Sequence, residues 1–60
     1  MQFKFRDINN YTYEHENHKA KSYDDIFNIM KNSYALLCVR LIDKKQVYLI
    51  VDKIKEVEIE

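Results

Sequence analysis

Three residues of the chain carry side chains that could bind zinc: His15, His18 and Cys38. Imidazole nitrogens and thiolates are common zinc ligands, but structural zinc sites use four ligands that occur in closely spaced pairs. Here only the two histidines form such a pair, and on an extended segment side chains three residues apart point to opposite sides. The spacing therefore predicts two solvated histidines and no metal site.

Nucleophilic catalysis would require Cys38 or a serine beside a general base. Cys38 lies in an apolar, strand-like run far along the chain from both histidines, which predicts a small buried hydrophobe in a reducing compartment. Ser22 is expected to cap a helix, and paired carboxylates occur only in surface runs such as Asp24-Asp25. Because the chain has no glycine, it has no phosphate-binding loop. We therefore expect a non-enzymatic protein without a cofactor.

The composition describes one small domain, residues 1–60, with balanced charge. Ten Lys and Arg residues offset ten Asp and Glu residues, so no strong field steers the chain onto DNA or makes it an acidic mimic of DNA. No stretch approaches the roughly 18 continuous apolar residues of a membrane span. The N-terminal MQFKFRD lacks the apolar core of a signal peptide. We expect a cytoplasmic protein that does not enter a membrane.

Small size and residue usage add two further expectations. A chain of 60 residues has marginal stability, and its single cysteine cannot form an internal disulfide. Lys, Ile, Asn and Tyr supply 25 of the 60 residues, as in short open reading frames of bacteriophages and mobile elements of low-GC bacteria. This amino-acid composition does not identify a protein family.

The hydrophobic centre of the sequence runs from Tyr34 to Val51, where two branched apolar runs flank the polar quartet Asp43 to Gln46. This pattern predicts a β-hairpin whose loop is the quartet and in which Ile42 faces Val47. Successive side chains of a strand alternate between faces. One face is then wholly apolar: Ala35, Leu37, Val39, Leu41, Tyr48 and Ile50. The other is apolar except for one arginine: Leu36, Cys38, Arg40, Ile42, Val47, Leu49 and Val51.

Two more strands are expected at residues 3–8 and 11–16, where polar and apolar residues alternate. A loop at residues 9–11, with Asn10 in the left-handed conformation, sets Arg6 opposite Glu14 and Lys4 opposite Glu16. It also groups four rings on the other face: Phe3, Phe5, Tyr13 and His15.

A helix is expected after Ser22, whose hydroxyl can accept a hydrogen bond from the backbone of the first turn. Its apolar face comprises Tyr23, Ile26, Phe27 and Met30, and Asn32 is expected to end it in the left-handed conformation. Residues 55–60 alternate again and predict a short edge strand whose glutamates face water. Together these elements predict an α+β fold of order ββαββ with a possible fifth edge strand. One helix packs on one face of a small antiparallel sheet of four or five strands.

The single helix can cover only one face of the central hairpin, and we expect it on the face of Leu37, Val39, Leu41, Tyr48 and Ile50. The opposite face would remain exposed, as an apolar patch larger than a monomer usually tolerates. We expect that face to form a homodimer interface, sheet against sheet or edge to edge. Arg40 would then need a carboxylate or carbonyl from a second subunit or a target. Alternatively, the N-terminal strands curl over this face and close a small barrel.

An apolar sheet face, free sheet edges and five tyrosines favour a non-enzymatic protein-binding module. With the phage-like composition, the hypothesis is a small phage or mobile-element inhibitor that acts as a homodimer and blocks a host protein. The expected partner-binding or dimer residues are Leu36, Cys38, Arg40, Ile42, Val47, Leu49, Val51, Tyr11, Tyr13, Tyr34 and Tyr48. The alternative function is single-stranded nucleic-acid binding. It would use an aromatic platform with a basic rim: Phe3, Phe5, Tyr11, Tyr13, Lys4, Arg6, Lys19 and Lys21.

Overall fold

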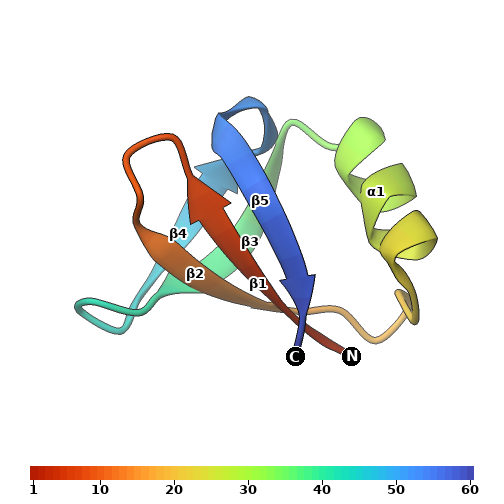
Figure 1. Cartoon of the computed structure of the whole chain (residues 1–60), viewed down its shortest axis with the longest axis horizontal. Coiled ribbons are helices and arrows are strands. Elements are labelled where there is room, and N and C mark those ends of the chain that lie inside the picture. The colour runs from red at the N-terminus through yellow and green to blue at the C-terminus, as the bar shows by residue number, and fades with distance from the viewer.

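The computed structural model describes all 60 residues and contains one five-stranded antiparallel sheet, in the order β4-β3-β2-β1-β5. The strands are β1 (Gln2–Asp7), β2 (Thr12–Glu16), β3 (Ala35–Arg40), β4 (Lys45–Ile50) and β5 (Ile54–Ile59). Helix α1 (Tyr23–Lys31) connects β2 to β3, and the 3-10 turn η1 (Val51–Lys53) leads from β4 into β5. The expected α+β fold is confirmed, including the fifth strand, which lies beside β1 (Figure 1).

The turn between β1 and β2 depends on Asp7. Its carboxylate accepts hydrogen bonds from the backbone N–H groups of Asn9 (2.9 Å) and Tyr11 (3.0 Å). Asn10 has φ 67°, the left-handed conformation predicted for it. Because the backbone N–H of Asp7 already bonds to the carbonyl of Tyr11, the loop begins at Ile8 rather than at Asn9.

The register of β1 and β2 also differs from the prediction, because the loop begins one residue earlier. Lys4 faces Glu14 instead of Glu16, and Arg6 faces Thr12 instead of Glu14. The predicted grouping of the rings is nevertheless confirmed, because the strands slide without exchanging their faces. Two opposed pairs hold the rings on one face: Phe3 with His15, and Phe5 with Tyr13.

The hairpin of β3 and β4 also turns earlier than predicted. Asp43 accepts hydrogen bonds from the backbone N–H of Lys45 and from the guanidinium of Arg40, and Lys44 takes up the left-handed conformation at φ 59°. Val47 therefore faces Cys38, so its predicted pairing with a residue in the turn is wrong. The strand residues keep their predicted faces, since this slide also preserves the alternation. Leu41 and Ile42 lie in the turn and Val51 in η1, so their predicted places on the two faces are wrong.

Helix α1 begins as predicted, because Ser22 Oγ accepts a hydrogen bond from the backbone N–H of Asp25 (3.1 Å). It ends differently: Asn32 has φ −100° and ψ 10°, so the expected left-handed cap is wrong. The backbone N–H of Asn32 instead bonds to carbonyl oxygens of the last helical turn, including that of Asn28. This arrangement satisfies the helix end without a positive φ.

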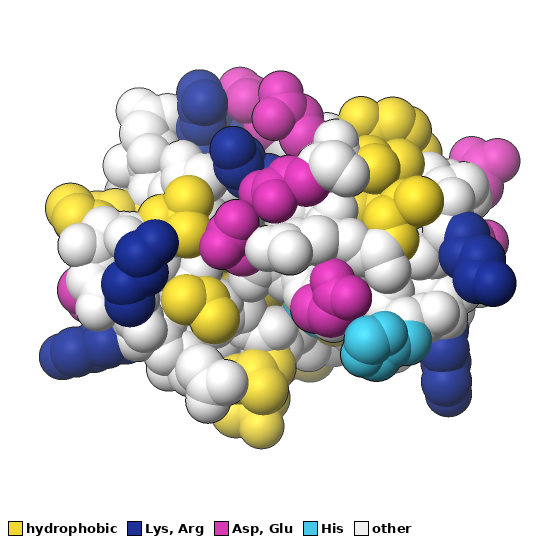
Figure 2. All heavy atoms as spheres, turned by 90° about the horizontal axis from the view of Figure 1, so that it is seen from below, with side chains coloured by type: hydrophobic (Ala, Val, Ile, Leu, Met, Phe, Trp, Pro, Cys, Tyr) yellow, Lys and Arg dark blue, Asp and Glu magenta, His cyan; other side chains and the backbone are white.

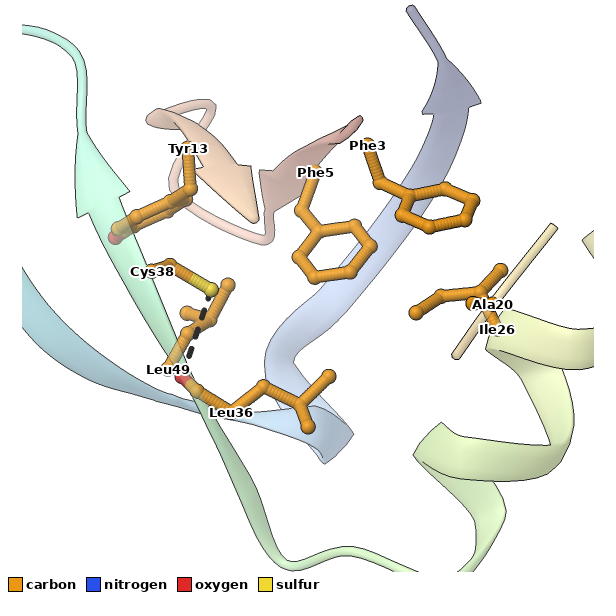
Figure 3. Close-up of a cluster of buried hydrophobic side chains, with 8 residues drawn as sticks. All are labelled: Phe3, Phe5, Tyr13, Ala20, Ile26, Leu36, Cys38 and Leu49. Atoms are coloured by element: carbon orange, nitrogen blue, oxygen red, sulfur yellow. Dashed lines mark hydrogen bonds between the residues drawn. The ribbon is translucent and has the colours of Figure 1, made fainter. Parts of the chain in front are cut away.

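The core lies between the two hairpins, on the face predicted to be exposed. Its buried apolar side chains are Phe3, Phe5, Tyr13, Ala20, Ile26, Leu36, Cys38 and Leu49. Figure 3 shows the rings of Phe3 and Phe5 between side chains of β3 and side chains at the start of α1. The sheet is curled, and the N-terminal strands pack over this face of the β3–β4 hairpin, as the alternative proposed. They do not close a barrel, because β4 and β5 remain unpaired edges of the sheet.

Helix α1 packs against this same core. Ile26 is fully buried, and Ile29 and Met30 pack against the cluster, whereas Tyr23 and Phe27 are 45% and 48% exposed. The prediction that all of the stripe from Tyr23 to Met30 packs on the Leu37 side of the hairpin is therefore wrong. The helix and the N-terminal strands cover one face, and the other face is left without a covering element.

The curl depends on a short junction between β2 and β3. The two strands pair only at Tyr13 with Arg40 and at Glu14 with Val39. Beyond these pairs, a side-chain hydrogen bond takes the place of backbone hydrogen bonds between the strands. Nδ1 of His15 donates to the carbonyl oxygen of Leu37 (2.8 Å). The His15 ring also stacks on Phe5, with 5.4 Å between ring centroids. Because the strands diverge here, α1 can insert Ile26 into the core.

Candidate functional site

Five of the predicted interface residues are in or against the core. Leu36, Cys38 and Leu49 are 8%, 2% and 6% exposed, and Val47 and Val51 are partly buried against the same cluster. The prediction that this face is exposed is wrong, because β1 and β2 supply the rings that pack on it. These side chains are not at the surface for a second molecule to contact.

Arg40 and Ile42 lie at the turn end of the hairpin. Nη2 of Arg40 donates to a carboxylate oxygen of Asp43 at 2.6 Å, so its charge is paired within the chain. The expectation that Arg40 needs a carboxylate from a partner is therefore wrong. The same hydrogen bond lowers the pKa of Asp43 to about 2. Ile42 is 76% exposed in the turn, where its side chain has no neighbouring strand to pack on.

The tyrosines divide into buried and exposed ones. Tyr34 and Tyr48 are 77% and 74% exposed, as expected for contact residues, and Tyr11 is 44% exposed. Tyr13 is 5% exposed, so its predicted role at a binding surface is wrong. Because Phe3 and Phe5 are buried as well, the aromatic platform predicted for single-stranded nucleic acid is not at the surface.

One exposed apolar surface is the side of the β3–β4 hairpin that points away from the core. This outer hairpin face consists of Ala35, Leu37, Val39, Gln46, Tyr48 and Ile50. Leu37 and Tyr48 stand directly opposite each other at its centre, and they are 45% and 74% exposed. The sequence showed that this face is apolar, but we expected the helix to cover it. Tyr34 immediately precedes β3 and is also exposed.

The two edges of the sheet differ in how they are protected. On β5, the backbone N–H of Ile59 donates to the hydroxyl of Tyr23 in α1 (3.2 Å), and Glu56 and Glu58 are exposed on that strand. Covering elements and charged side chains are common protections of edge strands against pairing with other chains. On β4, no element covers the edge, and Tyr48 stands in the middle of the strand. Figure 1 shows β4 at the end of the sheet, away from α1.

The outside of β2, β1 and β5 carries charged side chains of both signs, some of them in ion pairs. The one hollow in the surface is an open groove between Arg6, Thr12 and Glu58, among others, and Arg6 pairs with Glu56 at 3.6 Å. Partial burial and the neighbouring Glu14 carboxylate raise the pKa of Glu60. Figure 2, viewed from the side of the chain ends, shows acidic side chains next to basic ones. The glutamates of this half lie beside Lys4 and Arg6, so acidic and basic side chains alternate across it.

Cys38 and the two histidines, which were considered for catalysis, do not form a reactive site. Burial raises the pKa of the Cys38 thiol to about 12, so the nucleophilic thiolate is scarce at neutral pH. His15 is 7% exposed and lies within hydrogen-bond distance of Leu37 and Asn17, so the prediction that it is solvated is wrong. His18 is exposed beside Glu16, as predicted. No group of three or more His, Cys, Asp or Glu side chains converges as a metal site would require.

One buried polar pair was not predicted from the sequence. Asp7 is 5% exposed and accepts a 2.7 Å hydrogen bond from the hydroxyl of Tyr13. Burial by itself would raise the pKa of Asp7, but the hydrogen bonds from Tyr13, Tyr11 and Asn9 together lower it. Burial and the hydrogen bond to Asp7 raise the pKa of Tyr13 to about 12. The pair stabilises the β1–β2 turn and is not open to a substrate.

No protein-family model matches the chain, and neither the curated proteins nor the solved structures contain a significant match. Helix α1 has only nine residues, and the structure contains no helix with the length and apolar character needed to cross a bilayer.

Proposed function

We propose that the chain is a non-enzymatic protein-binding module whose contact surface is the outer hairpin face. The observation that carries this proposal is the opposed pair Leu37 and Tyr48, exposed at the centre of a sheet face that no other element covers. Exposed apolar faces mark protein interfaces, and tyrosine supplies contact area at a low cost in conformational entropy. The phage-like composition supports a more specific role, in which the module binds and blocks a host protein. The cytoplasm is the proposed location, because it is a reducing compartment and the chain has one free thiol.

Capture from a host lysate with matched baits tests this function. The tagged baits are the wild-type chain, Leu37→Glu and the control Phe27→Glu; the native side chains are 45% and 48% exposed. The wild type and Phe27→Glu should capture the same protein, and Leu37→Glu should capture about tenfold less, because a charge enters the centre of the interface. Circular dichroism establishes that all three baits are folded. Equal capture by Leu37→Glu and the wild type would contradict the proposal.

A further inference from the structure

The free edge of β4 presents backbone groups of three residues. The backbone N–H of Val51 bonds to the carbonyl of Tyr34, and Ile50 lies opposite Ala35. In an antiparallel ladder, backbone groups of successive residues point alternately toward the partner strand and away from it. The N–H and C=O groups of Gln46, Tyr48 and Ile50 therefore point away from β3, into solvent. The side chains of these same residues lie on the outer hairpin face.

We propose that β4 pairs in antiparallel fashion with β4 of a second copy of this chain, so that the two sheets become one continuous sheet. This inference rests on the proposed function, in which the outer hairpin face is a contact surface. It identifies a second copy of the chain as the partner at the β4 edge of that face. The two-fold axis passes beside Tyr48, which faces Tyr48 of the second copy, and Gln46 faces Ile50 of the second copy. This register uses all of the outward-pointing backbone groups, whereas a register shifted in either direction leaves some of them without a partner.

The charges at the two ends of β4 favour a second copy over an unrelated strand. Asp43 and Lys44 come before the strand, and Asp52 and Lys53 come after it; all four side chains are exposed. In the two-fold register, the turn that carries Lys44 comes close to η1 of the second copy, which carries Asp52. The two-fold axis repeats this pair at the other end of the interface. Opposite charges therefore meet at both ends of the interface. Such pairs at the rim of an interface set its orientation and register more than its affinity.

The β4–β4 contact produces a dimer and no larger assembly. A two-fold contact uses the same surface on both chains and therefore closes. The remaining edges of the joined sheet would be the two copies of β5, where Tyr23 bonds to Ile59 and glutamates line the strand. These features oppose further pairing. The dimer also places the two outer hairpin faces side by side, which doubles the apolar surface offered to a target.

Disulfide trapping tests the register. In the proposed dimer the Cα atoms of the two Tyr48 residues are about 5.5 Å apart, within the range that a disulfide bridges. Tyr48→Cys should therefore cross-link almost completely under a mild oxidant such as diamide. Gln46→Cys, the matched control, should not cross-link, and the double variant Gln46→Cys/Ile50→Cys should. The wild type, in which Cys38 is buried, should remain uncross-linked.

Sedimentation equilibrium of the wild-type chain completes the test, with a concentration-dependent monomer–dimer equilibrium as the expected result. A monomer at every concentration overturns the dimer. If Leu37→Glu still loses its captured protein in that case, the proposed function stands and the β4 edge serves a different protein. If nothing is captured either, both proposals fail. A dimer in which Gln46→Cys cross-links as fast as Tyr48→Cys overturns the proposed register.

Discussion

Replacing Phe5 with alanine is expected to unfold most of the chain at room temperature. The Phe5 ring is fully buried, stacks on His15 and lies at the centre of the core. Removing a buried phenylalanine side chain costs about 3–5 kcal/mol, through lost burial and the cavity that remains. A chain of 60 residues has a total stability of similar size, so the folded state should no longer predominate.

Urea titration followed by circular dichroism measures this loss. Phe27→Ala is the matched control, because the same side chain is removed from a position that is 48% exposed. We expect it to change the free energy of unfolding by less than about 1 kcal/mol. If Phe5→Ala were as stable as Phe27→Ala, the rings of β1 would not form the core.

Tyr13→Phe is expected to lower the free energy of unfolding by about 1.5–3 kcal/mol at neutral pH, the range for a hydrogen bond to a charged group. It removes the 2.7 Å hydrogen bond to Asp7 and leaves a carboxylate that is still buried. The variant should lose less stability than the wild type when the pH falls, because less of its stability depends on an ionised Asp7. With the Tyr13 hydrogen bond gone and the burial unchanged, the pKa of Asp7 rises.

The sign of the acid effect follows from the direction of the shift. The folded state holds the pKa of Asp7 below its ordinary value of 3.8, so its stabilisation is complete above that pH and is lost as the pH falls further. In Tyr13→Phe this loss should be smaller, because the folded-state pKa of Asp7 is no longer held as far below its ordinary value. In the wild type, the Tyr13 contribution is lost in alkali, as the pH rises from the ordinary pKa of 10.0 to about 12.

Urea titrations between pH 2 and pH 7, roughly the range in which carboxyl groups titrate, measure this difference. Tyr11→Phe is the control, because it removes a hydroxyl from a neighbouring tyrosine that is 44% exposed. It should leave both the stability and its pH dependence unchanged. If the free energy of unfolding had the same pH dependence in Tyr13→Phe and the wild type, the buried hydrogen bond would not govern the protonation of Asp7.

Much of the secondary structure could be predicted because it depends on local features. Ser22 and the first turn of α1 specify the helix start, and strict alternation specifies which residues share a strand face. The registers could not be predicted. Each depends on a turn aspartate, Asp7 or Asp43, whose side chain bonds to particular backbone groups and moves the loop by a small step.

The sequence could not show which face of the β3–β4 hairpin is inside, because both faces are apolar. The choice depends on long-range packing: the rings of β1 and β2 need an apolar surface, and only the face of Leu36, Cys38 and Leu49 meets them in the curled sheet. The predicted contact surface was consequently inverted. Tyr34 was placed correctly at the surface, whereas Tyr48 was named as a contact residue on a face that we also expected the helix to cover. A half-polar ring such as that of Tyr48 does not require an apolar neighbour on every side.

The reactivity of Cys38 tests most directly whether the chain buries this face by itself. It is the only cysteine, and its side chain lies in the core between the two hairpins. We predict that a thiol reagent such as 5,5′-dithiobis(2-nitrobenzoate), added at a concentration where the chain sediments as a monomer, labels Cys38 only through unfolding. Labelling would then be far slower than in the urea-unfolded chain. A folded monomer labelled as fast as the unfolded chain would contradict the account, because this face would then be open to solvent.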